Sequence, residues 1–458
     1  MQTLPSDPQP ARSSGLALAP FRAIRYNPDR VRGLADVTSP PYDVIGPGIV
    51  ERLLAAEPHN VVRLILPGAG SPQPPRGPGA SELAAAELRD WLGSGVLAQD
   101  ARPALYVYEQ SLPGADRWAD GRADGGEDGW EVVQRGLIGA LRLVPPGSPS
   151  VLPHEDVMAG PVEGRRELMA VTRANLEPIF LLYGGAGDPP STATGLVDEV
   201  AATRPPLVCA VTDDGTRHRL WALTDPAEHA AVAADLAART ALIADGHHRY
   251  AAYLKLQEQA REAGHGEGPW DYGLAFLVDS GAYPPRIGPI HRVIRALSPA
   301  RAAEMAKGAM RVQAQPGRLE DAVAALGDAG RAGPAFLLTD GDEHYLLTDP
   351  VPERLAEAMP ADHSARWQSL AASVLRELLI RSVWGLADAE PDVGVVNGEA
   401  TTAVRAARQA GGTAVIGTPV AAADVRAVAE NGERMPRKST SFGPKPRTGL
   451  LLRTLSGP

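Results

Sequence analysis

The chain has 458 residues, of which 44% are hydrophobic, so it is long enough for two or three domains and can bury a large core. Its formal net charge of −10 argues against non-specific binding to nucleic acid, and no apolar run reaches the roughly 18 residues that span a membrane. The single cysteine, Cys209, excludes a disulfide framework within the chain and fits a reducing, cytoplasmic setting.

Residues 1–15 lack the hydrophobic core of a signal peptide, and we expect a disordered leader there. A main α/β domain is expected over 16–297. Its first landmark is the run SPPYDV, in which consecutive prolines fix φ and present Tyr42 and Asp43 in one direction. Asp43 is therefore a candidate catalytic carboxylate, although it equally suits a structural role as cap of the helix expected over 47–56.

Alternating and periodic stretches predict the elements that follow. Residues 61–66 are predicted to form a strand, and Ser81 is predicted to cap a helix that ends at 93–95. Strands are predicted at 104–110 and 131–143, joined by a solvated Gly- and Asp-rich loop at 113–130.

The dipeptide His154-Glu155 precedes a charged helix and a strand at 179–183. Such a pair can transfer protons or bind a metal. It is not the HExxH zinc motif, because no histidine follows at the required spacing. A structural role for both residues stays open.

The stretch 241–264 predicts a short strand, a tight Asp-Gly turn and a helix. The free amides and the dipole of the first helical turn favour an anion, and Arg249 can add a bidentate contact to phosphate. Asp245 could instead act as the N-cap of the helix. We predict a phosphate-binding turn formed by Gly246, His247, His248 and Arg249.

Further elements are a hairpin at 207–223, a helix at 227–239 and a buried strand at 272–278. The pair His291-Arg292 repeats the pairing of His248-Arg249. We therefore consider that both pairs frame one polyanionic site.

From residue 298 to 453 the composition predicts a smaller α+β lobe. It comprises two alanine-rich helices, a strand pair at 335–339 and 344–348, an amphipathic helix over 362–384 and a βαβ unit over 393–417.

The lobe ends in a basic segment with six basic and no acidic residues from Arg434 to Arg453. Small hydroxyls beside lysine suit phosphate contacts, although the glycine spacing is not that of a Walker A loop. The alternative is a surface tail attracted to the acidic body. The candidate ligands in this segment are Lys438, Ser439, Thr440 and Lys445.

The segments SPPYDVI, NVVRLILP, YVYEQ, EPIFLLY, ADGHHRY, PIHRV and MPRKSTSFGPKPRTGL occur in this order. Together they resemble the bacterial and archaeal family known as domain of unknown function 1015, over residues 18–453. The DGHHR turn that opens a helix also resembles the nucleotide-phosphate motif of ParB/sulfiredoxin-like folds, in particular the archaeal free-serine kinases. This second resemblance implies that residues 245–249 bind the phosphates of ATP or ADP.

The favoured hypothesis is a small-molecule kinase, with free L-serine as the best single acceptor. Phosphoryl transfer needs a phosphate cradle, charge neutralisation by Mg²⁺ and basic groups, and a base for the attacking hydroxyl. Arg292 and Lys438 are the expected neutralising groups, and the motif does not decide the catalytic residue. Its candidates are Asp43, His154, Glu155 and Asp245.

Two other classes of function stay open. One is a nucleotide-binding regulatory protein of ParB-like type. The other is a metal-dependent hydrolase that uses His154, Glu155, His247, His248 and His291, although no local spacing supports it. Partners are expected to be a nucleotide and a small substrate, with homo-oligomerisation left open. The expected fold class is mixed α/β, with a ParB/sulfiredoxin-like core.

Overall fold

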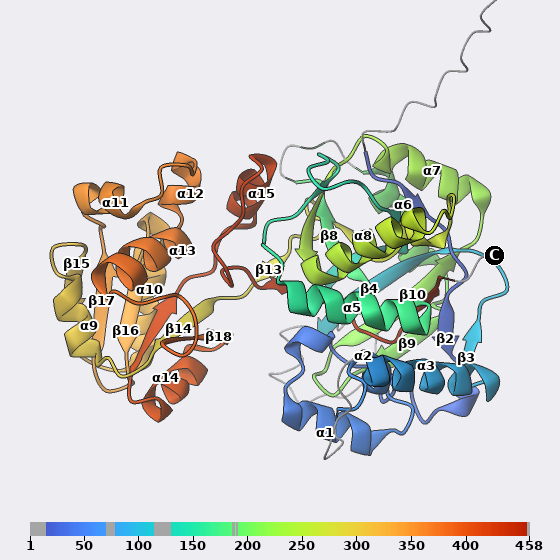
Figure 1. The fold of residues 1–458 in the computed structure, drawn as a ribbon, viewed down its shortest axis with the longest axis horizontal. Helices are drawn as coiled ribbons and strands as arrows, with labels where there is room; N and C mark the ends of the chain where they lie inside the picture. The colour runs from blue at the N-terminus through green and yellow to red at the C-terminus, as the bar shows by residue number, and fades with distance from the viewer. Residues whose placement is uncertain (1–14, 70–77, 114–129, 186–187, 189–190, 456–458) are drawn as a thin grey trace, which may run out of the picture. The chain divides into compact units, whose positions relative to one another are not determined.

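A computed structural model describes residues 15–69, 78–113, 130–185, 188 and 191–455 (Figure 1). The predicted leader, except Gly15, and residues 114–129 of the predicted Gly- and Asp-rich loop lie outside these described residues. The chain is divided into two compact units. Unit 1 comprises the described residues of Met1–Pro153, Val157–Pro284 and Pro444–Pro458, and unit 2 comprises His154–Asp156 and Pro285–Gly443.

The division falls at Pro284, before the predicted boundary at residue 297, and it assigns His154–Asp156 to unit 2. It also separates the basic segment, because Lys438 belongs to unit 2 and Lys445 to unit 1. The division into a main domain and a smaller lobe stays a prediction.

Unit 1 is built on a nine-stranded mixed sheet. The strand order is β6-β11-β8-β12-β5-β4-β10-β9, and β1 pairs with β5 outside this order. Only the pairs β12–β8 and β11–β6 are parallel. The strands are β1 (Leu18–Ala19), β4 (Leu105–Pro113), β5 (Trp130–Arg142), β6 (Val151–Leu152), β8 (Ile179–Tyr183), β9 (Val208–Val211), β10 (Arg217–Leu223), β11 (Ala241–Asp245) and β12 (Tyr272–Asp279).

Long helices bury apolar faces against this sheet in one large hydrophobic core. Figure 1 shows α5 and α8 side by side, and these two helices pack against each other. The helices are α5 (Ala159–Thr172), α6 (Thr192–Thr203), α7 (Pro226–Leu236) and α8 (His247–Glu262).

A second core in unit 1 collects short elements from the N-terminal part of the chain. Its elements include α2 (Val62–Ile65), α3 (Pro78–Gly93) and the paired strands β2 (Ile24–Tyr26) and β3 (Leu97–Gln99). Strand β7 (Ala174–Asn175) contributes Ala174 and pairs with β21 (Arg453–Thr454), and α1 (Pro47–Ala56) contacts α2 outside this core.

Two local predictions in this region are wrong. The segment predicted as a strand at 61–66 is the helix α2, because the Asn60 side chain accepts from the Val62 amide and donates to the carbonyls of Asp36 and Thr38. This local hydrogen bonding overrides the β-branched composition. Ser81 is also not a helix cap, since α3 already begins at Pro78, a residue favoured in the first helical turn.

Unit 2 contains a six-stranded sheet in the order β15-β17-β16-β19-β14-β18. Helix α14 (Ala400–Gln409) connects β18 to β19, and both strands are antiparallel to the β14 strand between them. The predicted βαβ crossover is therefore present with one strand inserted. The strands are β14 (Ile290–Ile294), β15 (Arg311–Ala314), β16 (Phe336–Thr339), β17 (His344–Thr348), β18 (Val393–Asn397) and β19 (Thr413–Gly417), and β13 (Arg286–Ile287) pairs separately with β20 (Phe442–Gly443).

The helix predicted over 362–384 is interrupted at Leu370, whose extended ψ of 136° ends the first helical segment. The chain then continues as one α-helical turn that becomes a π-helix (η5, Val374–Val383). The predicted apolar face is confirmed, because Trp367, Leu370, Val374, Leu378 and Leu379 are all buried. The remaining helices of unit 2 are α9 (Pro299–Ala306), α10 (Leu319–Ala332), α11 (Pro352–Ala358), α12 (Ala365–Ser369), α13 (Ala371–Ser373) and α15 (Ala422–Glu430).

The predicted mixed α/β class is confirmed in both units. Among the described residues, no helix combines the length and the apolar composition needed to cross a membrane.

Candidate functional site

The candidate site of unit 1 forms where β11 ends and α8 begins. Gly246 is the N-cap and adopts φ +94°, a left-handed conformation that glycine tolerates best. A Cβ atom added there would lie 2.9 Å from Ile179 Cγ2 and 3.2 Å from two guanidinium nitrogens of Arg249. No side chain caps α8, so the alternative of Asp245 as N-cap is wrong. The Asp245 carboxylate is instead available for charged partners.

Arg249 holds one side of that carboxylate. Its guanidinium makes a short ion pair with Asp245 Oδ2 and donates to the Pro178 carbonyl at 2.6 Å. The side chain is only 3% exposed. Burial alone would lower the pKa of Arg249, but Glu177, Asp245 and Asp43 raise it above its ordinary value. Arg249 therefore stays positively charged and fixes the Asp245 carboxylate through its Oδ2 atom.

Lys445 holds the other side of Asp245 and bridges it to Asp43. The Lys445 Nζ atom lies 2.5 Å from Asp245 Oδ1 and 2.6 Å from Asp43 Oδ2. Burial opposes the charge of Lys445, but the two carboxylates raise its pKa. Two carboxylates from distant parts of the chain therefore converge on one cationic atom.

Asp43 is the more accessible of the two carboxylates. Its side chain is 36% exposed, compared with 9% for Asp245. Burial acts to raise the pKa of Asp43, but Lys445 and Arg249 outweigh it and lower the pKa. Asp43 does not cap α1, whose N-cap is Gly46. The predicted alternative, Asp43 as the cap of this helix, is therefore wrong, and its carboxylate pairs with Lys445 instead.

Glu177 connects the segments that carry these residues. Its Oε1 atom accepts from the Tyr42 amide at 3.0 Å and from the Thr448 hydroxyl at 3.3 Å. Its Oε2 atom lies 3.9 Å from Arg165 Nη1. Burial raises the pKa of Glu177 above its ordinary value. The Arg165 guanidinium also lies 4.2 Å from the centre of the Tyr42 ring, which supports the turn before Asp43.

The two histidines occupy the first turn of α8. His247 is buried, whereas His248 is partly exposed and its Nε2 atom accepts from the Met158 amide at 3.1 Å. This bond assigns the proton of a neutral His248 to Nδ1. It also links the start of α8 to the start of α5.

The other half of the predicted site residues lies in unit 2. His154 Nε2 lies 2.9 Å from Thr440 Oγ1, and Glu155 Oε1 accepts from the Lys438 amide at 3.4 Å. The His154 carbonyl accepts from the Met435 amide at 2.7 Å. The His-Glu dipeptide and the basic segment therefore meet within unit 2.

Arg292 and His291 have structural partners on either side of β14. Arg292 pairs with Asp388 and donates to the carbonyls of Arg437 and Lys438 at 2.9 and 3.1 Å. His291 bridges the Gly398 carbonyl and the Gly417 amide, and burial lowers its pKa. The two His-Arg pairs thus differ in partners and belong to different units.

The proposed metal ligands do not gather in the described part of the chain. No group of three or more His, Cys, Asp or Glu side chains there is placed to hold a metal ion. His154, Glu155 and His291 belong to unit 2, whereas His247 and His248 belong to unit 1. The hydrolase alternative therefore gains no support from geometry.

The sequence patterns missed several residues of the unit 1 site. Arg447 donates to the Thr38 hydroxyl and carbonyl, and its amide donates to Tyr108 Oη. Tyr108 Oη contacts His218 Nδ1 at 2.8 Å, and burial lowers the pKa of His218 to about 4. The one local signal that could have found Glu177 is its position directly before Pro178 and the fully buried strand β8.

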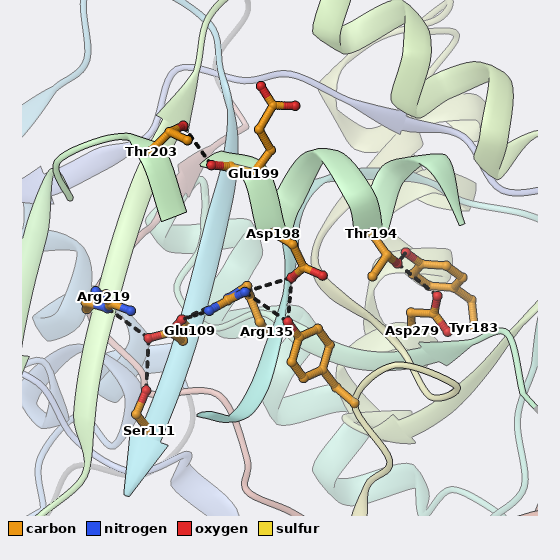
Figure 2. Close-up of polar contacts among 11 residues, drawn as sticks. Glu109, Ser111, Arg135, Tyr183, Thr194, Asp198, Glu199, Thr203, Arg219 and Asp279 are labelled. Atoms are coloured by element: carbon orange, nitrogen blue, oxygen red, sulfur yellow. Dashed lines mark hydrogen bonds and ion pairs between the residues drawn. The ribbon is translucent and has the colours of Figure 1, made fainter. Parts of the chain in front are cut away.

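A second charged cluster in unit 1 is closed around its own counter-ions (Figure 2). The fully buried Glu109 on β4 accepts from Arg135 on β5 and from Arg219 on β10 at 2.5 and 2.8 Å. Arg135 also reaches Asp198 of α6 at 2.7 Å and Tyr283 Oη at 3.0 Å. Since each of these charges is neutralised by a neighbour, we assign the cluster a structural role.

The chain matches one family of known proteins. The model of the family described as "Protein of unknown function (DUF1015)" matches residues 18–373. No curated protein matches the sequence.

Several solved structures resemble the chain at low identity. A free serine kinase variant in complex with ADP is 15% identical, with a TM-score of 0.31 over 64% of this chain and 84% of that chain. A conserved hypothetical protein from Pyrococcus furiosus is 14% identical, with a TM-score of 0.30 over 64% and 87%. C-terminally truncated SbnI from Staphylococcus aureus is 10% identical, with a TM-score of 0.34 over 69% and 87%. Sequence identities and TM-scores this low do not support a function for this chain, so any functional proposal must rest on the site geometry. The ParB/sulfiredoxin-like core stays a prediction.

Proposed function

The chain belongs to the DUF1015 family, and we propose that it is a phosphotransferase whose unit 1 binds ATP or ADP at the start of α8. The phosphoryl group passes to a hydroxyl of a small molecule, with free L-serine as the first acceptor to test. The observation that carries this proposal is the convergence of Asp43 and Asp245 on Lys445, beside a helix start that no side chain caps.

The helix start supplies the phosphate cradle. The first amides of α8 have no intrahelical acceptor and follow the Gly246 turn, where the absence of Cβ lets a ligand approach the backbone. Lys445 is a cation at the same place and can move from the carboxylates to a phosphate oxygen. In this proposal Arg249 is a positioning residue, because its guanidinium is buried on Asp245 and on the Pro178 carbonyl.

The pair of carboxylates fits Mg²⁺. The Asp43 and Asp245 oxygens lie within 2.6 Å of one cationic nitrogen, so this place already favours a positive charge. Mg²⁺ in nucleotide enzymes is commonly held by one or two carboxylates together with phosphates and waters, so a third protein ligand is not required. Bound there, Mg²⁺ would neutralise charge on the transferred phosphoryl group.

The two carboxylates divide their roles by exposure. Asp245 is buried and fixed on both sides, which suits it to hold the cation. Asp43 is more exposed and stays ionised because its pKa is lowered, so it accepts a hydrogen bond from the acceptor hydroxyl and orients that group. His154 and Glu155, the other candidates, belong to unit 2 and stay predictions.

A coupled assay tests the proposal. Purified protein is incubated with Mg²⁺ and ATP or ADP against a panel of free amino acids that includes L-serine. We expect a phosphorylated acceptor from the wild type, and a loss of 100-fold or more in kcat, on the order of a general-base contribution, for Asp43→Asn. His248→Ala and Arg249→Ala should also lose activity, whereas Asp213→Asn, an exposed carboxylate of unit 1, is the matched control.

Two outcomes contradict a kinase at this site. Equal activity of Asp43→Asn and Asp213→Asn would place the chemistry elsewhere. Binding of nucleotide without turnover of any acceptor would favour the regulatory alternative.

A further inference from the structure

The basic segment of unit 2 lines a small cavity that the proposed kinase site does not use. The cavity has a volume of about 30 Å³, and its lining includes Arg292, Arg376, Asp388, Thr418, Lys438 and Ser439. A water needs about 10–15 Å³, so the cavity holds a group of two or three water-sized atoms. This size suits a carboxylate or phosphate head group.

Arg292 holds the turn that presents Lys438 to this cavity. The Arg292 side chain is 6% exposed, and its charge is balanced by Asp388 at 3.0 Å. Its two terminal nitrogens donate to the carbonyls of Arg437 and Lys438, which turns these carbonyls inward. Lys438 adopts φ +53°, a left-handed conformation that costs a lysine energy and is kept by these contacts.

Lys438 lines the cavity and is exposed, so its charge is accessible to a ligand. Its amide donates to Glu155 Oε1, and among the described residues its ammonium makes no ion pair or hydrogen bond. Because Asp388 compensates Arg292, Lys438 gives the lining an excess of positive charge. Arg376 adds a second guanidinium at the cavity, and its Nε atom lies 3.4 Å from Glu377.

Backbone amides reach the cavity from the opposite side. Ala371 and Ala372 line it and begin a helical run that continues through the π-helix to Val383. No side chain caps this run, and its amides before Val374 have no intrahelical acceptor, since the Val374 amide donates to the Leu370 carbonyl. π-Helices are rare and are frequent at functional sites.

We propose that unit 2 binds the oxyanion head group of a small ligand in this cavity, between Lys438 and the amides of Ala371 and Ala372. Arg292 is the positioning residue that keeps the Lys438 turn in its left-handed conformation. The head group is a phosphate or a carboxylate.

Methyl NMR of the full chain, labelled at alanine and threonine methyl groups, tests this site directly. Inorganic phosphate and acetate are the two probes, and sodium chloride at equal ionic strength is the reference. The methyl groups of Ala371, Ala372 and Thr418 should shift to saturation with one of the probes but not with chloride. The probe that saturates at the lower concentration identifies the head group.

Lys438→Met should weaken the saturation at least tenfold, whereas Arg437→Met, a neighbour that does not line the cavity, should leave it unchanged. An unchanged Thr440 methyl signal in the free Lys438→Met protein shows that the segment keeps its fold. Shifts that stay linear in both probes, or that are equal in the two variants, would overturn the proposal. These signals report on unit 2 alone, so the result is independent of any kinase activity in unit 1.

Discussion

Lys445 is the residue on which the geometry of the unit 1 site depends most. It lies between two carboxylates that would otherwise repel each other, and its Nζ atom pairs with both. Glu177 does not contact Lys445 in these interactions but positions the segments around it, because it accepts hydrogen bonds from the Tyr42 amide before Asp43 and from the Thr448 hydroxyl. The site is therefore positioned by side chains that themselves need buried counter-charges.

Glu177→Gln tests this positioning role. The amide keeps an acceptor for the Tyr42 amide and for Thr448 but removes the negative charge beside Arg165 and Arg249. We expect KM for the nucleotide to rise about tenfold, roughly the loss of one charged hydrogen bond, with a smaller effect on kcat. Steady-state kinetics measure both constants, and Glu258→Gln on the exposed face of α8 is the control. A large fall in kcat with unchanged KM would instead give Glu177 a role in the chemical step.

Gly246→Ala tests the need for glycine at the helix start. The alanine must adopt φ +94° and place its Cβ 2.9 Å from Ile179, so we expect a loss of about 2 to 4 kcal/mol from strain and overpacking. Gly264, after the other end of the same helix, has φ +77° with nothing within 4 Å of an added Cβ, and its replacement by Ala should cost about 1 kcal/mol. Urea unfolding measures both variants. Equal losses would show that packing against Ile179 does not restrict this turn.

At the scale of elements, the sheet of unit 1 is tied across β5, β4 and β10 by one buried carboxylate. Burial acts to raise the pKa of Glu109, but its bonds to Arg219 and Arg135 outweigh burial and lower the pKa (Figure 2). A lowered folded pKa stabilises the protein above the pKa of the unfolded chain, and this contribution is lost as the pH falls through the folded value.

Glu109→Gln should therefore destabilise the protein by about 3 kcal/mol at neutral pH, because two guanidinium groups lose their buried partner. The difference from the wild type should shrink below about pH 4.3, where the carboxylate of the unfolded chain takes up its proton. Chemical unfolding between about pH 3 and pH 7, which covers the titration of carboxylates, measures this difference. Glu163→Gln, which removes an exposed partner of Arg166, should change stability little at any pH. A pH-independent loss in Glu109→Gln would show that the ion pairs do not carry the effect.

Much of the element pattern could be read from the sequence, because helix and strand periodicity reflect burial directly. Helix α8 and strands β11 and β12 are found where the apolar runs and the Asp-Gly turn predict them. The errors at 61–66 and 362–384 have another origin. In both places a single residue, Asn60 or Leu370, redirects the backbone through contacts or torsions that a hydropathy pattern does not contain.

At the scale of the whole molecule, the site could be predicted only in part because its residues are remote in sequence. Asp43 and Lys445 are 402 positions apart and yet form one ion pair. Sequence patterns single out both residues as candidate site residues, but they offer no means to pair them. They also do not separate Lys438 from Lys445, which belong to different units although only six residues of the basic segment lie between them. The acceptor and the oligomeric state stay predictions.

The affinity for ADP, measured by titration calorimetry with Mg²⁺ present, tests the central claim most directly. We predict binding to the wild type and to Lys438→Met, with a dissociation constant raised at least tenfold in Lys445→Met. Both variants replace a lysine by methionine, Lys445 in unit 1 and Lys438 in unit 2, so the comparison shows in which unit the lost charge matters. Unchanged affinity in Lys445→Met, or a loss confined to Lys438→Met, would contradict a nucleotide site at the start of α8.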